Sequence, residues 1–390
     1  MSSSPTSVAT PAEVVIDLDA IAANAATLCE RVPGRALMAV VKADAYGHGL
    51  VPCARAALAG GATWLGVAQV AEAVALREAG IVAPVLAWLY APGSDLSTAL
   101  ARDIDLSVAA PWALEEVLNA ARSTGRRARI HLKIDTGLGR GGSTSRDWPE
   151  LLAATGKAVA SDAIELVGIW SHMACADDPT HPTVRRQREV FLDALAAAER
   201  VGLRPQLRHL ANSAATLTSP DTHFDLVRPG LALYGLSPVP QLAGPAAYGL
   251  RAAMTVRARL ALVKDVPAGT GVSYAHAYTT PAATTLGLVP LGYADGILRH
   301  ASNAGPVQVG ALRTRVAGRV CMDQFVVDLG PGACVRAGDL VTIFGDGDQG
   351  VPTAQDWADA AGTISYEIVT SISGRLPRAW SGTDAREWTR

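Results

Sequence analysis

Lys42 lies where a short apolar run meets a glycine-bearing turn, which makes this lysine a candidate nucleophile. The run covers residues 37–41, and Ala-Asp-Ala-Tyr-Gly-His-Gly follows Lys42. This pattern predicts a buried strand with an amine at its carboxyl end. Because burial lowers the pKa of a lysine, the neutral amine could form a Schiff base. A strand-end lysine taken alone more often points into solvent, so its neighbours decide the interpretation.

Polar residues and glycines also follow four later apolar runs. They are Arg140 after the fifth run, His172 after the sixth, Asn212 and Ser213 after the seventh, and Arg228, Gly230 and Leu231 after the eighth. Barrel enzymes collect functional groups at strand ends, and the last two loops often hold a phosphate. A reactive lysine beside a phosphate site indicates pyridoxal phosphate. The simpler alternative is that Asn212 and Ser213 cap a helix while Gly230 turns the chain.

Arg228 would have a specific effect in such a site. As an ordinary strand-end arginine it would pair with Asp225 or with a helix carbonyl. Facing a pyridine nitrogen, it would keep that nitrogen unprotonated, because a guanidinium does not yield its proton. The ring would then withdraw electrons weakly, which disfavours transamination.

Eight apolar runs that alternate with alanine-rich helical segments predict a (β/α)8 TIM-type barrel. The runs are AVV, TWLGVA, VLAWLY, DLSVA, RIHLKI, ELVGIW, LRHL and DLV. Intervening helices are expected near residues 70–80, 111–125 and 182–202, each of which ends in glycine. An open doubly wound sheet is the alternative, although it usually needs fewer strands.

The sequence pattern changes after residues 238–249, a stretch rich in Pro, Gly and Ala that resembles a linker. The later segments MTVRARLALVKDV, TTLGLVPLGYA, RTRVAGRVCM, FVVDLG and DLVTIFG are β-branched and partly alternating. One short helix is expected near residues 353–361, with Thr353 as its N-cap. We therefore expect a barrel domain over residues 12–245 and a mainly β domain over residues 246–390.

Composition narrows the class of protein. The chain has 390 residues and a formal net charge of -2, without a basic block that interleaves with aromatics, which argues against nucleic-acid binding. Five scattered cysteines without CxxC pairs argue against a disulfide framework or structural zinc, and favour the cytoplasm. The first ten residues resemble a frayed tail, and no apolar run is long enough for a membrane span. No metal site is expected, because no carboxylate and histidine cluster has ligand spacing.

The chain resembles the alanine racemase family from about Glu13 to Arg378. This family consists of pyridoxal phosphate enzymes with a (β/α)8 barrel and a β domain. VKADAYGHG is similar to the family's cofactor-lysine motif, and the other matching motifs follow in the family's order: KIDTGLGR, SHMACAD, HLANSAAT, VRPGLALYG, VSYAHAYTT, LGYADG, GRVCMDQ and SYEIVTSISGRLPR. Leu138 and Gly374 depart from the usual pattern, at positions that the proposed chemistry does not use.

The resemblance implies a cofactor site for pyridoxal 5'-phosphate. Lys42 would hold the cofactor as a Schiff base, and Arg228 would face the pyridine nitrogen. The remaining cofactor-site residues would be Tyr46, His172, Asn212, Ser213, Gly230, Leu231 and Tyr366, of which His172 would link Arg228 to a catalytic tyrosine.

The resemblance also implies a homodimer with shared sites. Tyr274 would be the second catalytic base, in the site of the neighbouring subunit, and the Met322 backbone N–H would join Arg140 at the substrate carboxylate. Lys133 matches a lysine that is carbamylated in many members. Tyr293, Arg319 and Asp323 correspond to residues of the family's narrow entryway.

The implied activity is a two-base interconversion of L-alanine and D-alanine, which supplies D-alanine for peptidoglycan. Lys42 would serve the D enantiomer and Tyr274 the L enantiomer. A racemase for serine or for several amino acids is an alternative, as is a non-catalytic pyridoxal phosphate carrier. The β-rich tail and Tyr274 speak against a carrier. A barrel-type amino acid decarboxylase would carry glutamate where this chain offers Arg228.

Overall fold

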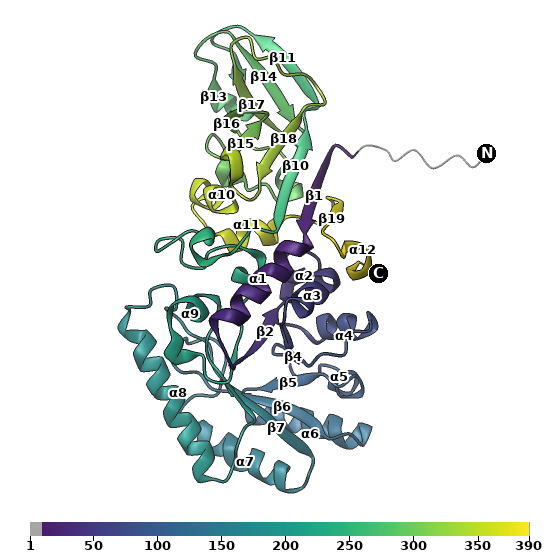
Figure 1. The fold of residues 1–390 in the computed structure, drawn as a ribbon, viewed down its shortest axis with the longest axis vertical. Coiled ribbons are helices and arrows are strands. Elements are labelled where there is room, and N and C mark those ends of the chain that lie inside the picture. The colour runs from purple at the N-terminus through teal and green to yellow at the C-terminus, as the bar shows by residue number, and fades with distance from the viewer. Residues whose placement is uncertain (1–9, 390) are drawn as a thin grey trace, which may run out of the picture. The chain divides into compact units, whose positions relative to one another are not determined.

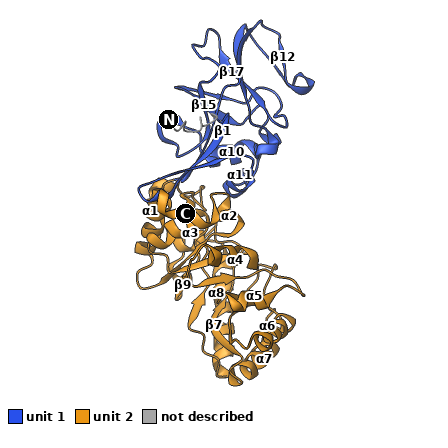
Figure 2. Cartoon of the chain, turned by 90° about the vertical axis from the view of Figure 1, so that its right-hand side faces the viewer, with its two compact units in different colours: residues 1–18, 252–385 blue, residues 19–251, 386–390 orange. Residues whose placement is uncertain are grey.

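The structure is a computed structural model that describes residues 10–389. It divides into two compact units, coloured separately in Figure 2. One unit holds residues 19–251 together with the residues from Arg386 onward, and the other holds the residues up to Leu18 together with 252–385. The expected N-terminal tail lies, apart from Thr10, outside the described residues.

The unit that contains Lys42 is a barrel of eight parallel strands in the order β8-β7-β6-β5-β4-β3-β2-β9. The strands are β2 (Ala36–Val40), β3 (Trp64–Val67), β4 (Val85–Ala87), β5 (Asp105–Val108), β6 (Ala128–Lys133), β7 (Ile164–Trp170), β8 (Leu207–His209) and β9 (Leu226–Val227). Backbone hydrogen bonds from Asp225 to Arg208 (3.1 Å) and from Arg228 to Ala211 (3.0 Å) join β8 to β9. The predicted (β/α)8 barrel is confirmed.

Helices connect the strands, and α4 to α8 lie along the outside of the barrel (Figure 1). The helices are α1 (Leu18–Arg31), α2 (Lys42–Tyr46), α3 (Leu50–Ala59), α4 (Val70–Glu78), α5 (Leu96–Ala101), α6 (Pro111–Thr124), α7 (Trp148–Ala160), α8 (Pro182–Arg200), α9 (Ser213–Thr218), η1 (Pro220–Thr222), η2 (Leu231–Tyr234), η3 (Pro245–Tyr248) and α12 (Ala385–Trp388). Pro111 begins α6, and Gly125 ends it with φ of 64°. The three helices expected from the sequence are confirmed.

The other unit is built mainly from strands. It contains a six-stranded sheet in the order β16-β15-β18-β10-β1-β19, a three-stranded sheet β11-β14-β17 and a two-stranded sheet β12-β13. The strands are β1 (Ala12–Asp17), β10 (Met254–Arg259), β11 (Leu262–Val266), β12 (Gly271–Val272), β13 (Tyr278–Thr279), β14 (Thr284–Val289), β15 (Pro306–Val309), β16 (Leu312–Arg315), β17 (Phe325–Gly330), β18 (Leu340–Phe344) and β19 (Arg378–Ser381). The mainly β character of this part of the chain is confirmed.

Six short helices interrupt these sheets. They are η4 (Tyr274–His276), η5 (Tyr293–Asp295), η6 (Arg299–Ala301), η7 (Asp348–Gly350), α10 (Ala354–Ala361) and α11 (Ser365–Ser371). The expected N-cap of α10 is confirmed, because Thr353 Oγ1 accepts from the Asp356 N–H and the Asp356 carboxylate accepts from the Thr353 N–H.

Residues 12–17 lie in the β-rich unit, and not at the start of the barrel domain as expected from the sequence. Their strand β1 pairs antiparallel with β10 and parallel with β19. Val14 and Ile16 are buried and alternate with partly exposed neighbours. This alternation reveals a half-buried strand, but not its partners, which lie at the far end of the chain.

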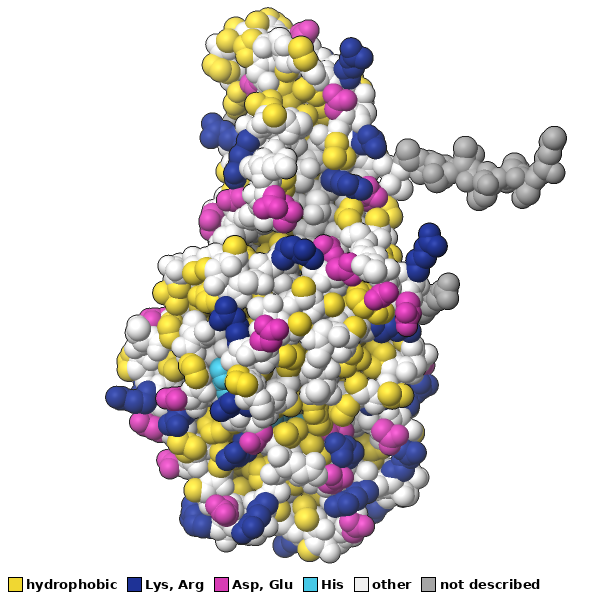
Figure 3. All heavy atoms as spheres, viewed as in Figure 1, with side chains coloured by type: hydrophobic (Ala, Val, Ile, Leu, Met, Phe, Trp, Pro, Cys, Tyr) yellow, Lys and Arg dark blue, Asp and Glu magenta, His cyan; other side chains and the backbone are white. Residues whose placement is uncertain are grey.

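The exterior of the molecule mixes both signs of charge. Figure 3 shows Lys and Arg side chains interspersed with Asp and Glu on the visible face. Within residues 10–389, no helix combines the length and the apolarity that a membrane crossing requires.

Candidate active site

Lys42 begins the connection after β2, where the backbone winds in the left-handed sense. Residues 43–46 have φ between 52° and 56°, and Gly47 and Gly49 follow with φ of 79° and 103°. Four consecutive residues with a Cβ rarely adopt this conformation, because Cβ crowds the following carbonyl oxygen at roughly 1 kcal/mol or more per residue. Other contacts must therefore stabilise the turn.

Glu72 of α4 supports this left-handed turn from outside it. Its Oε1 accepts from the Ala43 N–H at 2.6 Å, and its Oε2 accepts from the Ala68 N–H at 2.9 Å. Asp44 Oδ1 accepts from the Leu50 N–H at 2.8 Å. These bonds join the turn to the loop after β3 and to the start of α3, and so fix the backbone that carries Lys42.

Lys42 belongs to a cluster of basic groups, whose other members are Lys133, Arg140, His172 and Arg228. Burial lowers the pKa of Lys42, and the charge of Arg140 lowers it further. Burial, Arg140 and Arg228 together lower the pKa of Lys133 to about 8. The pKa of His172 lies well below its usual range because of burial and the nearby charges of Arg228 and Arg140. Groups that repel one another in this way form a site for anions.

Arg228 is buried and its guanidinium is held from several sides. Its Nη2 donates to the carbonyl oxygens of Ser171 (2.7 Å) and Leu210 (3.1 Å), and its Nη1 lies 3.2 Å from His209 Nδ1. Burial lowers its pKa to about 9. Asp225, which could have been its partner, pairs with a different arginine. The hydrogen-bond partners of Arg228 in the barrel interior are therefore neutral groups, and no carboxylate within residues 10–389 pairs with it.

The Trp170 ring lies close to two buried cations of this cluster, Lys133 and Arg228. Lys133 Nζ is 4.4 Å from the centre of its ring, and the Arg228 guanidinium carbon is 4.8 Å away. The negative face of an indole attracts desolvated cations, so Trp170 stabilises both charges.

Four residues of the predicted cofactor site, Tyr46, Ser213, Gly230 and Leu231, lie near the ends of β8 and β9. Ser213 Oγ accepts from the Gly230 N–H at 2.7 Å, and a Cβ on Gly230 would lie 2.2 Å from Tyr46 Oη. Leu231 follows as the buried first residue of η2. A hydroxyl, a phenol and backbone amides converge here, in a manner that suits a phosphate. Asn212 caps α9 by accepting from the Ala215 N–H at 3.1 Å, as the simpler alternative expects.

Arg140 is exposed at the end of a loop that Asp135 shapes. Asp135 Oδ1 accepts from the backbone N–H groups of Gly137 and Leu138, both at 2.9 Å. The glycine turn after β6 is thereby fixed, and it returns the chain past Lys133, whose Nζ lies 3.5 Å from where a Cβ on Gly141 would be.

The remaining candidates lie in the β-rich unit. Hydrogen bonds join the chain segments that carry four of them. Ser273, next to Tyr274, donates from Oγ to the Arg319 carbonyl at 2.7 Å. The Tyr293 N–H donates to the Cys321 carbonyl at 3.0 Å, beside Met322. The structure thus brings Tyr274, Tyr293, Arg319 and Met322 together.

Tyr274 lies on a strained and exposed segment. Ser273, Ala275 and His276 have φ of 62°, 58° and 45°. The exposed fraction is 70% for Tyr274, 55% for Met322 and 44% for Tyr293. Strained backbone and exposed large side chains are both typical of binding surfaces.

Asp323 and Tyr366 are positioned by neighbours in the same unit. Arg375 donates to Asp323 Oδ1 at 2.9 Å and lies 3.5 Å from Asp295. Tyr366 lies in α11, and the last residue of this helix approaches Gly296 so closely that a Cβ there would lie 2.3 Å from the Ser371 carbonyl oxygen.

Three residues with hydrogen bonds in or next to this site were not identified from the sequence: Glu72, His131 and His209. The two histidines interrupt the apolar runs RIHLKI and LRHL, and a polar residue inside a buried strand is the signal that could have found them. Glu72 forms a capping box with Gln69. Within residues 10–389, no cluster of three or more His, Cys, Asp or Glu side chains could hold a metal ion.

Comparisons with known proteins give a consistent result over nearly the whole chain. Residues 16–238 match the family model described as alanine racemase, N-terminal domain, and residues 253–380 match alanine racemase, C-terminal domain. An alanine racemase of Frankia casuarinae is 60% identical over 94% of this chain and 95% of its own length. The crystal structure of alanine racemase from D-cycloserine producing Streptomyces lavendulae is 57% identical, with a TM-score of 0.95 over 96% of this chain and 98% of that one.

Proposed function

Because the chain belongs to the alanine racemase family, we propose that it interconverts L-alanine and D-alanine with pyridoxal 5'-phosphate as its cofactor. Two observations support this proposal: Lys42 lies in a cluster of basic groups, and Ser213, Gly230 and Tyr46 bring together polar groups that could bind a phosphate. An amine of lowered pKa, surplus positive charge and a phosphate cradle together fit one anionic aldehyde cofactor.

The residues of the barrel fit this cofactor by their chemistry. Ser213, Tyr46 and the backbone of Gly230 and Leu231 would bind its phosphate. Lys42 would hold its aldehyde carbon, and Arg228 would face its pyridine nitrogen. His172 and Asn212 would line the same site, with Tyr366 as a further phosphate ligand.

Two bases on opposite faces of the substrate Cα would exchange its proton. The bound cofactor supplies electron withdrawal from the substrate amine, which makes the proton on Cα acidic. Lys42 Nζ would remove or return this proton on one face, and Tyr274 Oη of a second copy would do so on the other. Arg140 and the Met322 backbone N–H would bind the substrate carboxylate, which fixes Cα between the two bases.

A homodimer is part of this proposal. Tyr274, Met322 and Tyr293 are exposed together on the β-rich unit, and a second copy of the chain would cover them. Tyr293, Arg319 and Asp323 would then line the entryway to the site.

Lys133 would carry a carbamate. Its pKa of about 8 leaves an appreciable share of neutral amine at mildly alkaline pH. The ammonium form would first lose one proton. The neutral amine nitrogen would then add to the carbon of CO2 and lose a second proton, so that a buried cation becomes an anion. The carbamate would offset the charge of Arg140, which lowers the pKa of Lys133.

The cytoplasm is the proposed location, and peptidoglycan synthesis the proposed use of D-alanine. The five cysteines are free thiols in the structure, which favours a reducing compartment.

The direct test is to incubate the purified protein with L-alanine and with L-serine separately, with added pyridoxal phosphate, and to measure each D enantiomer. We expect D-alanine to form, and D-serine to form more slowly or not at all. Borohydride reduction of the loaded protein should attach the cofactor to Lys42. If the bound cofactor supports no D-alanine formation, the proposed activity is wrong, and a label on another lysine would contradict the proposed site.

A further inference from the structure

A line of buried polar side chains runs through the barrel interior from Arg228 to Asp105. Arg228 Nη1 lies 3.2 Å from His209 Nδ1, His209 Nε2 lies 2.9 Å from His131 Nδ1, and His131 Nε2 lies 3.3 Å from Asp105 Oδ2. Both imidazoles are fully buried. Buried polar groups in an apolar barrel are costly unless each has a partner, and here each has one.

The direction of every bond in this line follows from Arg228. A guanidinium can only donate, so His209 Nδ1 must accept. A neutral imidazole then carries its proton on Nε2, which donates to His131 Nδ1. His131 in turn carries its proton on Nε2 and donates to the Asp105 carboxylate. Each hydrogen bond in the line is therefore donated in the same direction, from the Arg228 cation toward the Asp105 anion.

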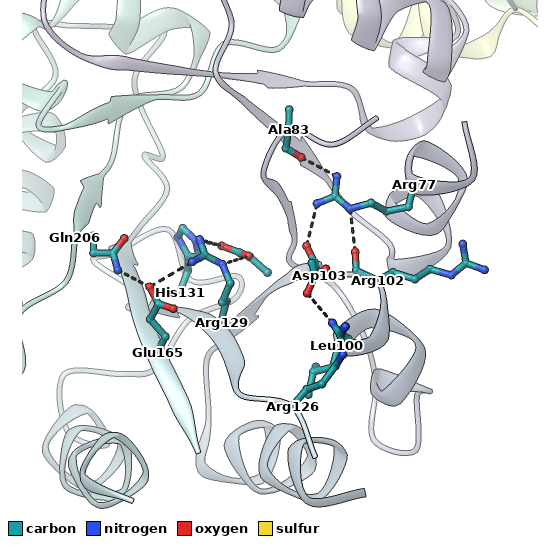
Figure 4. Close-up of polar contacts among 11 residues, drawn as sticks. Arg77, Ala83, Leu100, Arg102, Asp103, Arg126, Arg129, His131, Glu165 and Gln206 are labelled. Atoms are coloured by element: carbon teal, nitrogen blue, oxygen red, sulfur yellow. Dashed lines mark hydrogen bonds and ion pairs between the residues drawn. The ribbon is translucent and has the colours of Figure 1, made fainter. Parts of the chain in front are cut away.

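The far end of the line is held firmly. Arg129 donates to both oxygens of Asp105, at 2.8 and 3.2 Å, and also pairs with Glu165, which Gln206 contacts in turn (Figure 4). Burial favours the neutral form of Asp105, but hydrogen bonds from His131 and Arg129 outweigh this effect and keep its pKa low. Asp105 therefore remains an acceptor.

The rings themselves have little freedom to turn. A Cβ on Gly168 would lie 2.2 Å from His131 Nδ1, so glycine at this position leaves room for the imidazole. Trp170 stacks on His209 with ring centres 5.6 Å apart and planes at 1°. Burial and the charge of Arg228 place the pKa of His209 well below its usual range, in agreement with a neutral ring.

We propose that Asp105, acting through His131 and His209, positions Arg228 by fixing both imidazoles in the Nε2–H tautomer. If His209 carried its proton on Nδ1, two donors would face each other and the guanidinium would have to move. With His209 in the Nε2–H tautomer, three N–H groups of Arg228 have protein acceptors. A guanidinium carries five, so two remain for a ligand. This inference rests on the proposed function, in which that ligand is the ring nitrogen of pyridoxal phosphate.

Two substitutions at one residue separate this positioning role from simple packing. His131→Phe keeps a ring in the space beside Gly168 but offers His209 Nε2–H no acceptor. His131→Gln restores an amide oxygen for His209 and an amide N–H for Asp105, and so could replace the imidazole in the line. Trp64→Phe is the matched control, because Trp64 lies edge-on to His131 at 5.5 Å and contributes no bond to the line.

Nitrogen NMR of the full-length protein with labelled histidine, with and without pyridoxal phosphate, reads out the tautomers directly. We expect both His131 and His209 to be Nε2–H. His131→Phe should give mixed tautomers at His209, weaken pyridoxal phosphate binding about tenfold and shift the absorption band of the bound cofactor. His131→Gln and Trp64→Phe should retain the parent values.

Several results would overturn the proposal. In the parent protein, an Nδ1–H or doubly protonated His209 would do so without any variant. A His131→Phe protein with unchanged tautomers, affinity and absorption band would also do so. If the parent does not bind pyridoxal phosphate at all, the proposed function is wrong, whereas the tautomers of the cofactor-free protein still decide the arrangement of the line.

Discussion

The pKa of Lys133 is far below the usual value for a lysine. Its amine is buried near other cations, and its pKa falls to about 8. The unfolded chain keeps the ordinary value near 10.5. Below the folded pKa, both states are protonated and folding must bury the charge. Between the two values the unfolded chain holds the extra proton, so the stability of the folded state rises with pH.

We therefore predict that Lys133→Met stabilises the cofactor-free protein. In CO2-free buffer at pH 7, removal of the buried charge should raise the free energy of unfolding by about 2–3 kcal/mol. The difference from the parent should shrink between pH 8 and pH 10.5, where the parent itself becomes more stable. Denaturant midpoints measured at several pH values test this, and a difference that grows in this range would contradict it.

At the level of single residues, chemical type and position in a run identified much of the candidate site. Lys42, Arg140 and Arg228 follow apolar strands, and Ser213 with Gly230 follows the pattern of a phosphate loop. His209 was missed because its importance depends on a partner, Arg228, that only the closed barrel brings to within 3.2 Å.

The connection after β2 shows the limit of local sequence patterns for whole elements. Its strand was predictable from burial and β-branching, but the left-handed turn after it was not, because Ala43 to Tyr46 include no glycine. Glu72, which is distant in the sequence, accepts from the Ala43 N–H of this turn. By contrast, α10 was predictable because its capping box is local.

Glu72→Gln tests this support. An amide keeps one acceptor but places an N–H group against a backbone N–H on its other side, so the free energy of unfolding should fall by about 1–3 kcal/mol. The pKa of Lys42 should fall further, because Glu72 now raises it. Competitive acetylation of Lys42 at several pH values measures this shift. Glu78→Gln on the same helix, where the carboxylate pairs with Arg102 at the surface, should change neither quantity appreciably.

Arg77 supports a second set of connections on the outside of the barrel. Its guanidinium donates to the carbonyl oxygens of Ile81, Ala83, Arg102 and Asp103, at 2.7–2.9 Å. Figure 4 shows the contacts with Ala83, Arg102 and Asp103. These carbonyls belong to the loops after α4 and after α5, which Arg77 thus joins.

Arg77→Ala should lower the free energy of unfolding by about 2–4 kcal/mol, because four carbonyl oxygens lose a charged donor. Arg102→Ala is the control, since its side chain forms an exposed ion pair with Glu78, which is worth at most about 1 kcal/mol. Equal losses in the two variants, measured by denaturant unfolding, would contradict the role assigned to Arg77.

At the scale of the whole molecule, the sequence predicted both kinds of architecture but not which segment joins which unit. The barrel was recognisable because each strand and helix lies next to its partner in the sequence. Strand β1 was not assigned to the β-rich unit, because β10 and β19 pair with it from the other end of the chain. Long-range pairing of this kind has no local signature.

The central claim is that Lys42 and Tyr274 act as opposed bases contributed by two copies of the chain. Lys42→Ala and Tyr274→Phe should each abolish alanine racemisation in the homodimer. A dimer of one copy of each variant, isolated through two different affinity tags, contains one site with both substitutions and one site with neither.

The rate of D-alanine formation by this mixed dimer is the most direct test. We predict about half the activity of the parent dimer, because one of the two sites is intact. A mixed dimer as inactive as the two variant homodimers would contradict a site shared between subunits.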